Sequence, residues 1–303
     1  MRIVFMGTPE FARKSLESLY DDGHDIAGVF TQPDKPRSRG LKPGFSQVKA
    51  LALEHNTPVF QPTTLKDGSA AAIVRELQCD LICVVAYAKL LTPDILEIPK
   101  YGCINIHGSL LPKYRGAAPI QWAIINGETE TGVTSMQVRE KMDVGEILLV
   151  YKTSIGDDET AGELFTRLGQ SGAILLSETV DAISRGALVR HPQNDREATH
   201  APPLSRVMSP IDWNDTAIRI KCKVRGLNPW PSATAEIFGT LCKILKVDVT
   251  GRYTGYPPGE IVSVGKDGIE IACADGTVMI KELQAPGRKR MPAGDYLHGL
   301  RTL

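Results

Sequence analysis

The chain has 303 residues, and its 35 basic and 35 acidic side chains give a formal net charge of zero. This length allows one large domain or two ordinary domains with buried cores. Its six cysteines include no Cys-x-x-Cys pair, so we expect reduced thiols and neither a disulfide framework nor a zinc site. No apolar run is long enough to span a bilayer, and we therefore expect a cytoplasmic protein.

The first part of the chain alternates strand patterns with helical patterns. Strands are predicted at 2–6, 25–31, 80–85 and 102–107, and helices at 9–20, 47–55, 69–77, 118–125 and 160–185. Such alternation is typical of a Rossmann-like α/β domain, in which helices cover both faces of a mostly parallel sheet. The unbroken apolar run at 80–85 fits a strand that is buried on both faces. We therefore predict an α/β domain over residues 1–189.

The second part of the chain has a different composition. Residues 190–205 are rich in proline and polar side chains, which indicates a linker. Strand patterns follow at 234–238, 241–249, 259–264, 268–272 and 278–283. Five short strands predict a small OB-like β-barrel over residues 206–303, a fold that often binds nucleic acid. From residue 205 onward, 14 basic residues outnumber 10 acidic ones, a balance that is compatible with a polyanionic partner.

Two polar side chains occur near the end of the strand predicted at 102–107. Asn105 and His107 alternate with Ile104 and Ile106, so the amide and the imidazole should lie on one side of the sheet. An amide donor and a titratable ring at a strand end suit a reaction in which an oxygen acquires negative charge and a proton moves. A strand end whose polar side chains merely satisfy loop carbonyls is the alternative.

Asp143 is a candidate partner for His107. It lies on a loop between strand patterns at 132–138 and 147–151, next to the flexible residue Gly145. A carboxylate close to His107 would orient the imidazole and favour its charged form. A turn-forming aspartate is the alternative, and on spacing alone it is favoured.

Several separated motifs together carry a family resemblance. They are Val4–Ala12, Thr31–Pro36, Asn105–Pro112 with Lys113–Ile120, and Leu227–Pro231. In this order they resemble the folate-dependent formyltransferases over nearly the whole chain, and within that family the bacterial enzymes that act on methionyl-tRNA. The resemblance implies a formyltransferase domain at 1–189 and a tRNA-binding OB-like domain at 206–303. It also implies that Asn105, His107 and Asp143 form the catalytic set.

The resemblance further implies a site for 10-formyltetrahydrofolate, the formyl donor, and no metal. The family segment that contacts the folate matches Ser109, Leu110, Leu111 and Pro112. The family loop that lines the pterin pocket matches residues 87–91, which include Lys89 and Leu90. Ordinary packing is the alternative role of that loop.

Two basic segments are candidate tRNA contacts. The long loop at 32–47 carries a single acidic residue and four basic ones, Lys35, Arg37, Arg39 and Lys42. Loops of this length are usually functional or disordered, and its cations could follow a phosphate backbone. The matching family loop reaches into the acceptor end of the tRNA, with its arginine at Arg39. The second segment contains Arg288, Lys289 and Arg290; a solvated charge run is the alternative there.

These features predict formyl transfer from 10-formyltetrahydrofolate to the α-amino group of methionyl-initiator tRNA, by a monomer that needs no membrane. A formyltetrahydrofolate hydrolase or a nucleotide-sugar formyltransferase could use the same three residues, but the long basic loop disfavours both. A glycinamide ribonucleotide formyltransferase would leave the second domain unexplained. A dehydrogenase is disfavoured because Gly7 is the only glycine of a dinucleotide motif present. A non-catalytic RNA-binding protein would need no catalytic set.

Overall fold

The computed structural model describes residues 1–36 and 43–300. The chain separates into two compact units, and each unit gathers more than one stretch of sequence. The first comprises Met1–Pro119, Thr131–Thr153 and Phe165–Ala201, and the second comprises Ile120–Glu130, Ser154–Leu164 and Pro202–Leu303.

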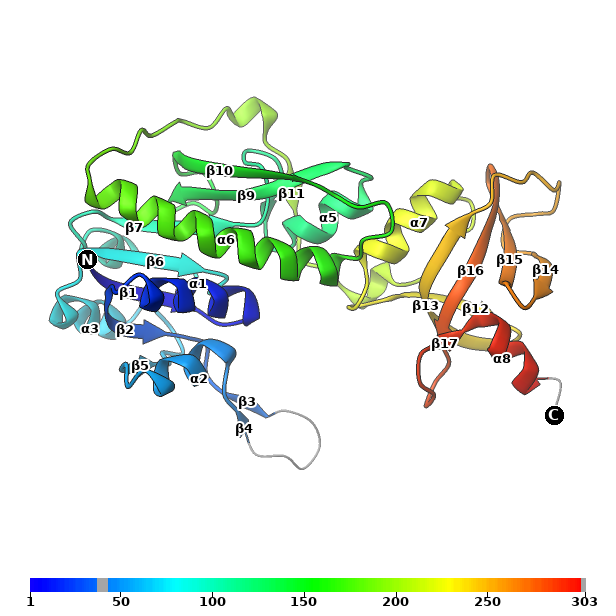
Figure 1. The fold of residues 1–303 in the computed structure, drawn as a ribbon, viewed down its shortest axis with the longest axis horizontal. Coiled ribbons are helices and arrows are strands. Elements are labelled where there is room, and N and C mark those ends of the chain that lie inside the picture. The colour runs from blue at the N-terminus through cyan, green and yellow to red at the C-terminus, as the bar shows by residue number, and fades with distance from the viewer. Residues whose placement is uncertain (37–42, 301–303) are drawn as a thin grey trace. The chain divides into compact units, whose positions relative to one another are not determined.

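A seven-stranded sheet forms the centre of the first unit, in the order β10-β9-β7-β6-β1-β2-β5 (Figure 1). Its strands are β1 (Arg2–Gly7), β2 (Asp25–Phe30), β5 (Val59–Phe60), β6 (Leu81–Val85), β7 (Cys103–His107), β9 (Glu130–Gln137) and β10 (Ile147–Ser154). The five strands from β5 to β7 run parallel, and β9 is antiparallel to β7. The predicted mostly parallel α/β sheet is therefore confirmed.

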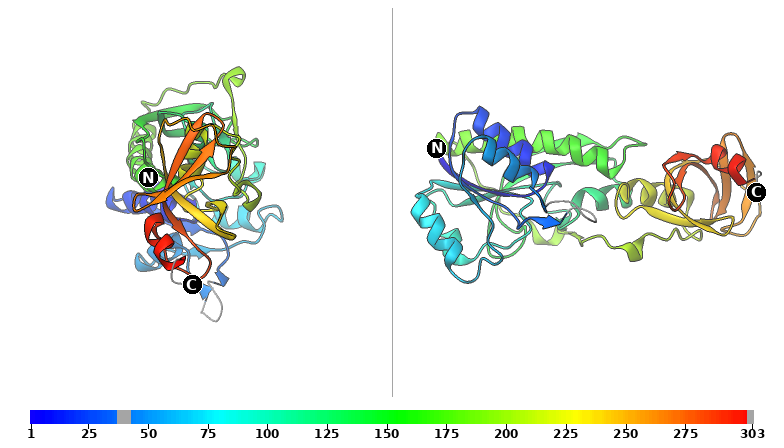
Figure 2. Two further views of the ribbon diagram at one scale, coloured as in Figure 1. Left: turned by 90° about the vertical axis from the view of Figure 1, so that its right-hand side faces the viewer. Right: turned by 90° about the horizontal axis from the view of Figure 1, so that it is seen from below.

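Helices cover both faces of this sheet (Figure 2). They are α1 (Glu10–Asp21), α2 (Gln47–Glu54), α3 (Ser69–Leu77), α4 (Pro93–Leu96) and α6 (Ala161–Ser184). Helices α3 and α4 pack on Val4 and Ile82, whereas Gly172 of α6 approaches Phe11 of α1 and Ile106 of β7 on the other face. Of the helices in the two described ranges, none has the length and the apolar character needed to cross a membrane.

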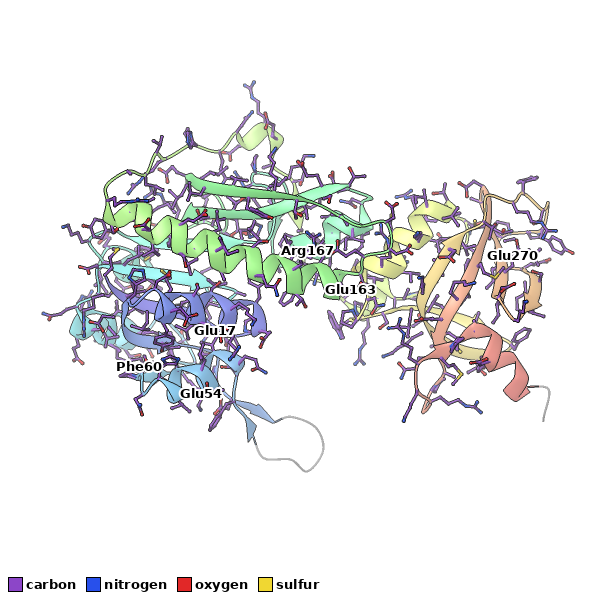
Figure 3. The ribbon with its side chains drawn as sticks, viewed as in Figure 1. Glu17, Glu54, Phe60, Glu163, Arg167 and Glu270 are labelled. Carbon is purple, nitrogen blue, oxygen red and sulfur yellow. The ribbon has the colours of Figure 1, made fainter. Side chains whose placement is uncertain are left out.

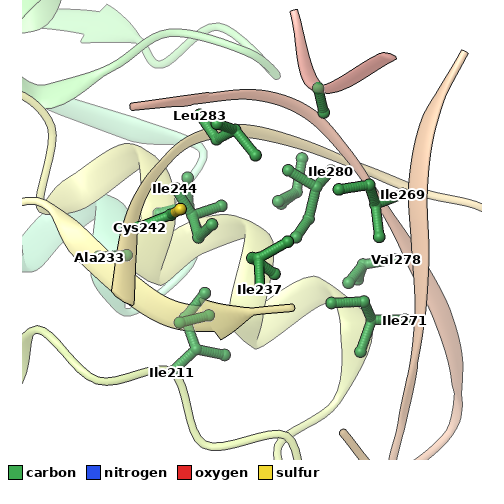
Figure 4. Close-up of a cluster of buried hydrophobic side chains, with 14 of the residues drawn as sticks. Ile211, Ala233, Ile237, Cys242, Ile244, Ile269, Ile271, Val278, Ile280 and Leu283 are labelled. Carbon is green, nitrogen blue, oxygen red and sulfur yellow. The ribbon is translucent and has the colours of Figure 1, made fainter. Parts of the chain in front are cut away.

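The second unit contains the predicted antiparallel β domain. Its strands are β12 (Ala233–Ile237), β13 (Thr240–Val249), β14 (Ile261–Gly265), β15 (Gly268–Cys273), β16 (Gly276–Gln284) and β17 (Met291–Pro292), and its helices are α5 (Pro119–Ile125), α7 (Ala217–Gly226) and α8 (Ala293–Leu300). The sheet order is β12-β13-β16-β15-β14, with β17 paired to β16. Ile237, Ile244 and Ile280 are fully buried in its core (Figure 4).

Helix α7 is absent from the sequence-based prediction. Its signals are the N-cap Thr216, whose hydroxyl accepts the amide of Arg219, and buried apolar residues at Ile220 and Val224. Three basic residues interrupt the apolar pattern: Lys221, Lys223 and Arg225. Their hydrophobic stems can lie along the helix while their charged ends find partners. Lys221 pairs with Asp158, and Lys223 and Arg225 donate to the carbonyls of Pro210 and Gly156.

The second unit also buries one carboxylate, that of Glu270 on β15 (labelled in Figure 3). Its oxygens accept hydrogen bonds from Thr277 Oγ1 at 2.7 Å and Ser263 Oγ at 2.8 Å, and Arg252 lies 3.4 Å away. The hydrogen bond from Thr277 is the main reason why the pKa of Glu270 lies below its ordinary value.

The hydrogen bonds to the Glu270 carboxylate predict a pH-dependent contribution to stability. A depressed pKa stabilises the fold above the unfolded pKa of about 4.3 and loses that contribution as the pH falls through the folded pKa. The thermal midpoint of the wild-type chain should therefore fall more steeply below about pH 5 than that of Glu270→Gln. Glu236→Gln, at an exposed position of β12, is the matched control and should keep the wild-type slope. Equal slopes for all three chains would contradict the assignment.

Candidate active site

Strand β7 brings Asn105 and His107 to the carboxyl edge of the sheet. Ile104 and Ile106 fill one face of the strand, at 0% and 3% exposure, so the alternating polar side chains take the other face. His107 lies opposite Thr134 of the neighbouring strand β9. Strand order reverses between β1 and β6, and ligands of open α/β sheets bind at the carboxyl ends near such a reversal.

The loop after β7 is fixed by hydrogen bonds from Thr134. Its Oγ1 donates to the carbonyl of Ser109 at 2.7 Å and accepts the amide of Leu111 at 3.3 Å. Ser109, fully buried, donates its own hydroxyl to the carbonyl of Lys113 at 2.7 Å. The Leu111–Pro112 peptide bond is cis. The segment that the sequence predicts as a folate contact is thus a turn held by several hydrogen bonds.

The ring of His107 is buried and contacts two groups. Nε2 lies 2.8 Å from the carbonyl oxygen of Tyr114, and Nδ1 lies 3.7 Å from Oδ2 of Asp143. The second distance is longer than a hydrogen bond, so this contact is an ion pair when the ring is charged. The structure therefore brings together two of the three residues predicted to be catalytic, although they are far apart in the sequence.

Asp143 is held by its backbone as well as by its side chain. Its φ angle is 55°, a left-handed conformation that few residues other than glycine adopt. Its carboxylate is buried and accepts the amide of Gly116 at 2.9 Å. The carboxylate therefore faces both Gly116 and the His107 ring, and cannot turn to solvent without breaking a buried hydrogen bond.

Asn105 differs from the other two residues because its side chain is only partly buried. Within residues 1–36 and 43–300 no hydrogen bond engages its amide group, whereas His107 and Asp143 are both engaged. An amide with free donors at a sheet edge can bind an oxygen of a ligand.

The loop that follows β6 contains Lys89 and Leu90. The Lys89 ammonium donates to the carbonyl of Thr63 at 3.0 Å and to that of Pro62, and burial lowers its pKa. Leu90 is 57% exposed. Lys89 therefore ties its own loop to residues 62–63, while Leu90 presents an apolar surface.

The base of the 32–47 loop is held by a polar network. Lys49 Nζ contacts Asp34 Oδ2 at 2.5 Å and Gln61 Oε1 at 2.8 Å, and Gln61 Nε2 donates to the carbonyl of Gln32 at 2.9 Å. The hydrogen bond from Lys49 is the main reason why the pKa of Asp34 is low. Strand β3 (Lys35–Pro36) pairs with β4 (Pro43–Gly44), so both stems of the loop are joined.

The predicted tRNA contacts fall in different places. Arg37, Arg39 and Lys42 lie outside the described residues, and of Lys35 only the backbone is described. In the second unit, Arg288, Lys289 and Arg290 are exposed. Arg290 donates to Glu282 at 2.5 Å, which partly neutralises this cluster.

The chain matches the formyl transferase family over residues 1–180 and the formyl transferase C-terminal domain over residues 204–301. The methionyl-tRNA formyltransferase of Alkaliphilus oremlandii is 48% identical over 299 residues, which are 99% of this chain and 96% of that protein. That of Geobacter sulfurreducens is 46% identical over 301 residues, 99% of this chain and 94% of that protein. The chain belongs to the methionyl-tRNA formyltransferase family.

Solved structures share the fold at lower identity. An N-formyltransferase from Helicobacter canadensis, in complex with folinic acid and dTDP-3-aminofucose, has a TM-score of 0.71 and 21% identity over 93% of this chain and 98% of its own. HypX from Aquifex aeolicus, in complex with tetrahydrofolic acid, has a TM-score of 0.65 and 18% identity over 98% of this chain and 47% of its own. These likenesses confirm the predicted formyltransferase fold.

Thr134 was not singled out by sequence analysis, yet it supports the loop of this formyltransferase. Thr134→Val removes the donor to the Ser109 carbonyl and the acceptor of the Leu111 amide, and each buried group left unpaired costs about 1–3 kcal/mol. The free energy of unfolding measured with denaturant should therefore fall by at least about 1 kcal/mol. Thr134→Ser keeps the hydroxyl and should lose less; equal losses in the two variants would show that the hydroxyl is dispensable.

Proposed function

We propose that Asn105, His107 and Asp143 transfer the formyl group of 10-formyltetrahydrofolate to the α-amino group of methionyl-initiator tRNA. The reaction follows from the family, whose members are 46–48% identical to this chain over nearly its whole length. The observation that supports the site is the buried contact between His107 Nδ1 and Asp143 Oδ2 at 3.7 Å, at the same sheet edge as the unengaged Asn105 amide. The product is the formylated initiator used in translation.

Asn105 and His107 have the chemistry to stabilise negative charge. The donor supplies a formyl carbon that an amine can attack, and the aminoacyl amine is a weaker base than lysine, so part of it is unprotonated near neutral pH. The Asn105 amide donates a hydrogen bond to the formyl oxygen as charge develops there, and the charged His107 ring stabilises the same oxygen. Removing one such donor costs about 100- to 1000-fold in kcat.

The hydrogen bond to Tyr114 assigns the protons of the His107 ring. A carbonyl oxygen only accepts, so Nε2 carries the hydrogen in that bond. Nδ1 is therefore the nitrogen that gains or loses a proton, and it is the nitrogen that faces Asp143. In this proposal Asp143 orients the ring, and the pair takes the proton that leaves the attacking amine. It passes that proton to the folate nitrogen as the bond between this nitrogen and the formyl carbon breaks.

The described residues fit the folate donor. We assign the donor contacts to Ser109, Leu110, Leu111 and Pro112, with Leu90 as an apolar surface for the pterin ring. The unengaged Asn105 amide supplies the polar contact that a formyl oxygen needs. The Lys89 ammonium is already bonded to two carbonyls, so we assign it to holding the loop that presents Leu90.

We assign tRNA binding to the loop residues Lys35, Arg37, Arg39 and Lys42 and to Arg288, Lys289 and Arg290. The net positive charge of the chain from residue 205 onward supports a C-terminal tRNA-binding domain over 206–303. Of the predicted linker at 190–205, residues 190–201 fall in the same compact unit as the predicted catalytic domain over 1–189. All three proposed catalytic residues lie in one unit, so a monomer suffices. We place the enzyme in the cytoplasm because its six cysteines are free and buried.

A labelled-formyl assay tests the catalytic set. His107→Ala should lower the rate of label transfer to methionyl-tRNA by about 100-fold or more, because the general acid–base group and its positive charge are both lost. His55→Ala, at an exposed position, is the matched control and should retain wild-type transfer. Label released as formate, or appearing on an amino-sugar nucleotide instead, would keep the folate chemistry but contradict the tRNA substrate.

The basic loop at 32–47 can be tested separately through its effect on tRNA binding. Arg39→Ala should raise the Kd for methionyl-tRNA without changing the KM for the donor, because the loop is assigned to the nucleic acid alone. Each lost phosphate contact should lower the slope of log K against log salt by about 0.7–0.9. Lys66→Ala, an exposed cation outside the loop, is the control. An unchanged slope for Arg39→Ala would show that this arginine does not contact a phosphate.

A further inference from the structure

The loop that carries Asp143 is held by a residue from the segment that the sequence predicts as a linker. Gln193 Nε2 donates to the carbonyl of Asp143 at 2.9 Å and to the carbonyl of Gly145 at 2.7 Å. One side-chain amide thus uses both of its hydrogens on the backbone that flanks Val144.

The orientation of the Gln193 amide is set by a buried arginine. Arg115 donates from Nε at 3.0 Å and from Nη2 at 2.7 Å to Gln193 Oε1, and Nη2 also contacts Asp195 Oδ1 at 2.8 Å. A guanidinium only donates, so the amide oxygen must face Arg115 and the amide nitrogen must face the two carbonyls. Arg115 is 7% exposed, so its guanidinium is held in place and fixes the direction of this contact.

The segment around Gln193 is anchored on both sides. His191 exchanges backbone hydrogen bonds with Ile147, at 2.9 Å and 2.8 Å, just beyond the Asp143 loop. After Gln193, β11 (His200–Ala201) pairs with β8 (Arg115–Gly116), whose Gly116 amide binds the Asp143 carboxylate. Gln193 is therefore fixed by backbone pairing on each side. Its amide bonds the main chain of Asp143, and the neighbouring strand β8 bonds the side chain of Asp143.

The Asp143 loop needs such support because its backbone is strained and crowded. Asp143 has a φ of 55°, and left-handed residues persist only where the surroundings hold them. Gly145 packs so closely that a Cβ atom would lie 1.6 Å from the carbonyl oxygen of Gln137. The loop can therefore hold its carboxylate beside His107 only while its own carbonyls remain bonded.

We propose that Gln193 is a positioning residue for Asp143, so that catalysis depends on the side-chain amide of a residue outside the predicted catalytic set. This inference rests on the proposed role of Asp143 in formyl transfer. Gln193 acts only through Asp143 and makes no contact with either substrate. Its loss should lower kcat and leave the KM for both substrates nearly unchanged.

Gln193→Glu is the sharpest substitution. The carboxylate still accepts from Arg115 but cannot donate to the carbonyls of Asp143 and Gly145, and its second oxygen is repelled by them, so the positioning contact is lost. Asn194→Asp makes the same chemical change at the next residue, which is exposed, and is the matched control. If Gln193→Glu does not fold, Gln193→Met, which lacks the donor and adds no charge, replaces it.

The experiment is a double-mutant cycle in kcat with Asp143→Ala, using the full chain and the labelled-formyl assay. Gln193→Glu alone should lower kcat by about 10- to 100-fold, as small displacements of catalytic groups do. In the Asp143→Ala background it should change kcat by less than about twofold, because residues that act through one another are not additive. Asn194→Asp should match the wild type in both backgrounds.

Three outcomes would overturn the inference. An equal loss of kcat in both backgrounds would show that Gln193 acts independently of Asp143, and an unchanged kcat for Gln193→Glu would show that it does not act at all. Wild-type kcat for Asp143→Ala would instead remove the proposed role of Asp143, and the positioning role would fall with it. The first two results leave the proposed function intact, so the two failures are distinguishable.

Discussion

A sheet that is covered by helices on both faces can present polar chemistry only where its strands end. In β1 every side chain from Ile3 to Met6 is fully buried, so neither face offers room for a substrate. Strand β7 is buried in the same way, and Asn105 is its one partly exposed residue. The position of the candidate site follows from this burial, and the loops after β6 and β7 are its natural walls.

Placing polar groups at a buried edge requires that nearly all of them be paired. Thr134 donates a hydrogen bond to the Ser109 carbonyl, and His107 bonds the Tyr114 carbonyl. The Asp143 carboxylate accepts a hydrogen bond from the Gly116 amide. Each contact removes a way for the site to relax, because an unpaired buried polar group is costly. Asn105 is the exception, and its unengaged amide is the reason why we propose that this edge binds a ligand.

The sequence predicts the central elements because they are long enough to carry a period. Helix α6 and strands β6 and β7 lie within one or two residues of their predicted bounds, whereas the two-residue strands β8 and β11 have no period to detect. The placement of Asp143 beside His107 depends on loop geometry, and on spacing alone the aspartate resembled an ordinary turn residue. The composition of residues 190–205 likewise predicts a linker. The polar side chain of Gln193 instead donates hydrogen bonds to the carbonyls of Asp143 and Gly145.

The pairing of β11 with β8 has a consequence for where the catalytic part of the chain ends. A fragment that stops at residue 189 would retain Asn105, His107 and Asp143, yet it would lack Gln193 and the strand that lies against Arg115. A fragment that continues through Ala201 would include both. Any fusion or exchange of C-terminal domains should therefore be spliced after Ala201, because Gln193 and β11 support the proposed active site although the composition of their segment resembles that of a linker.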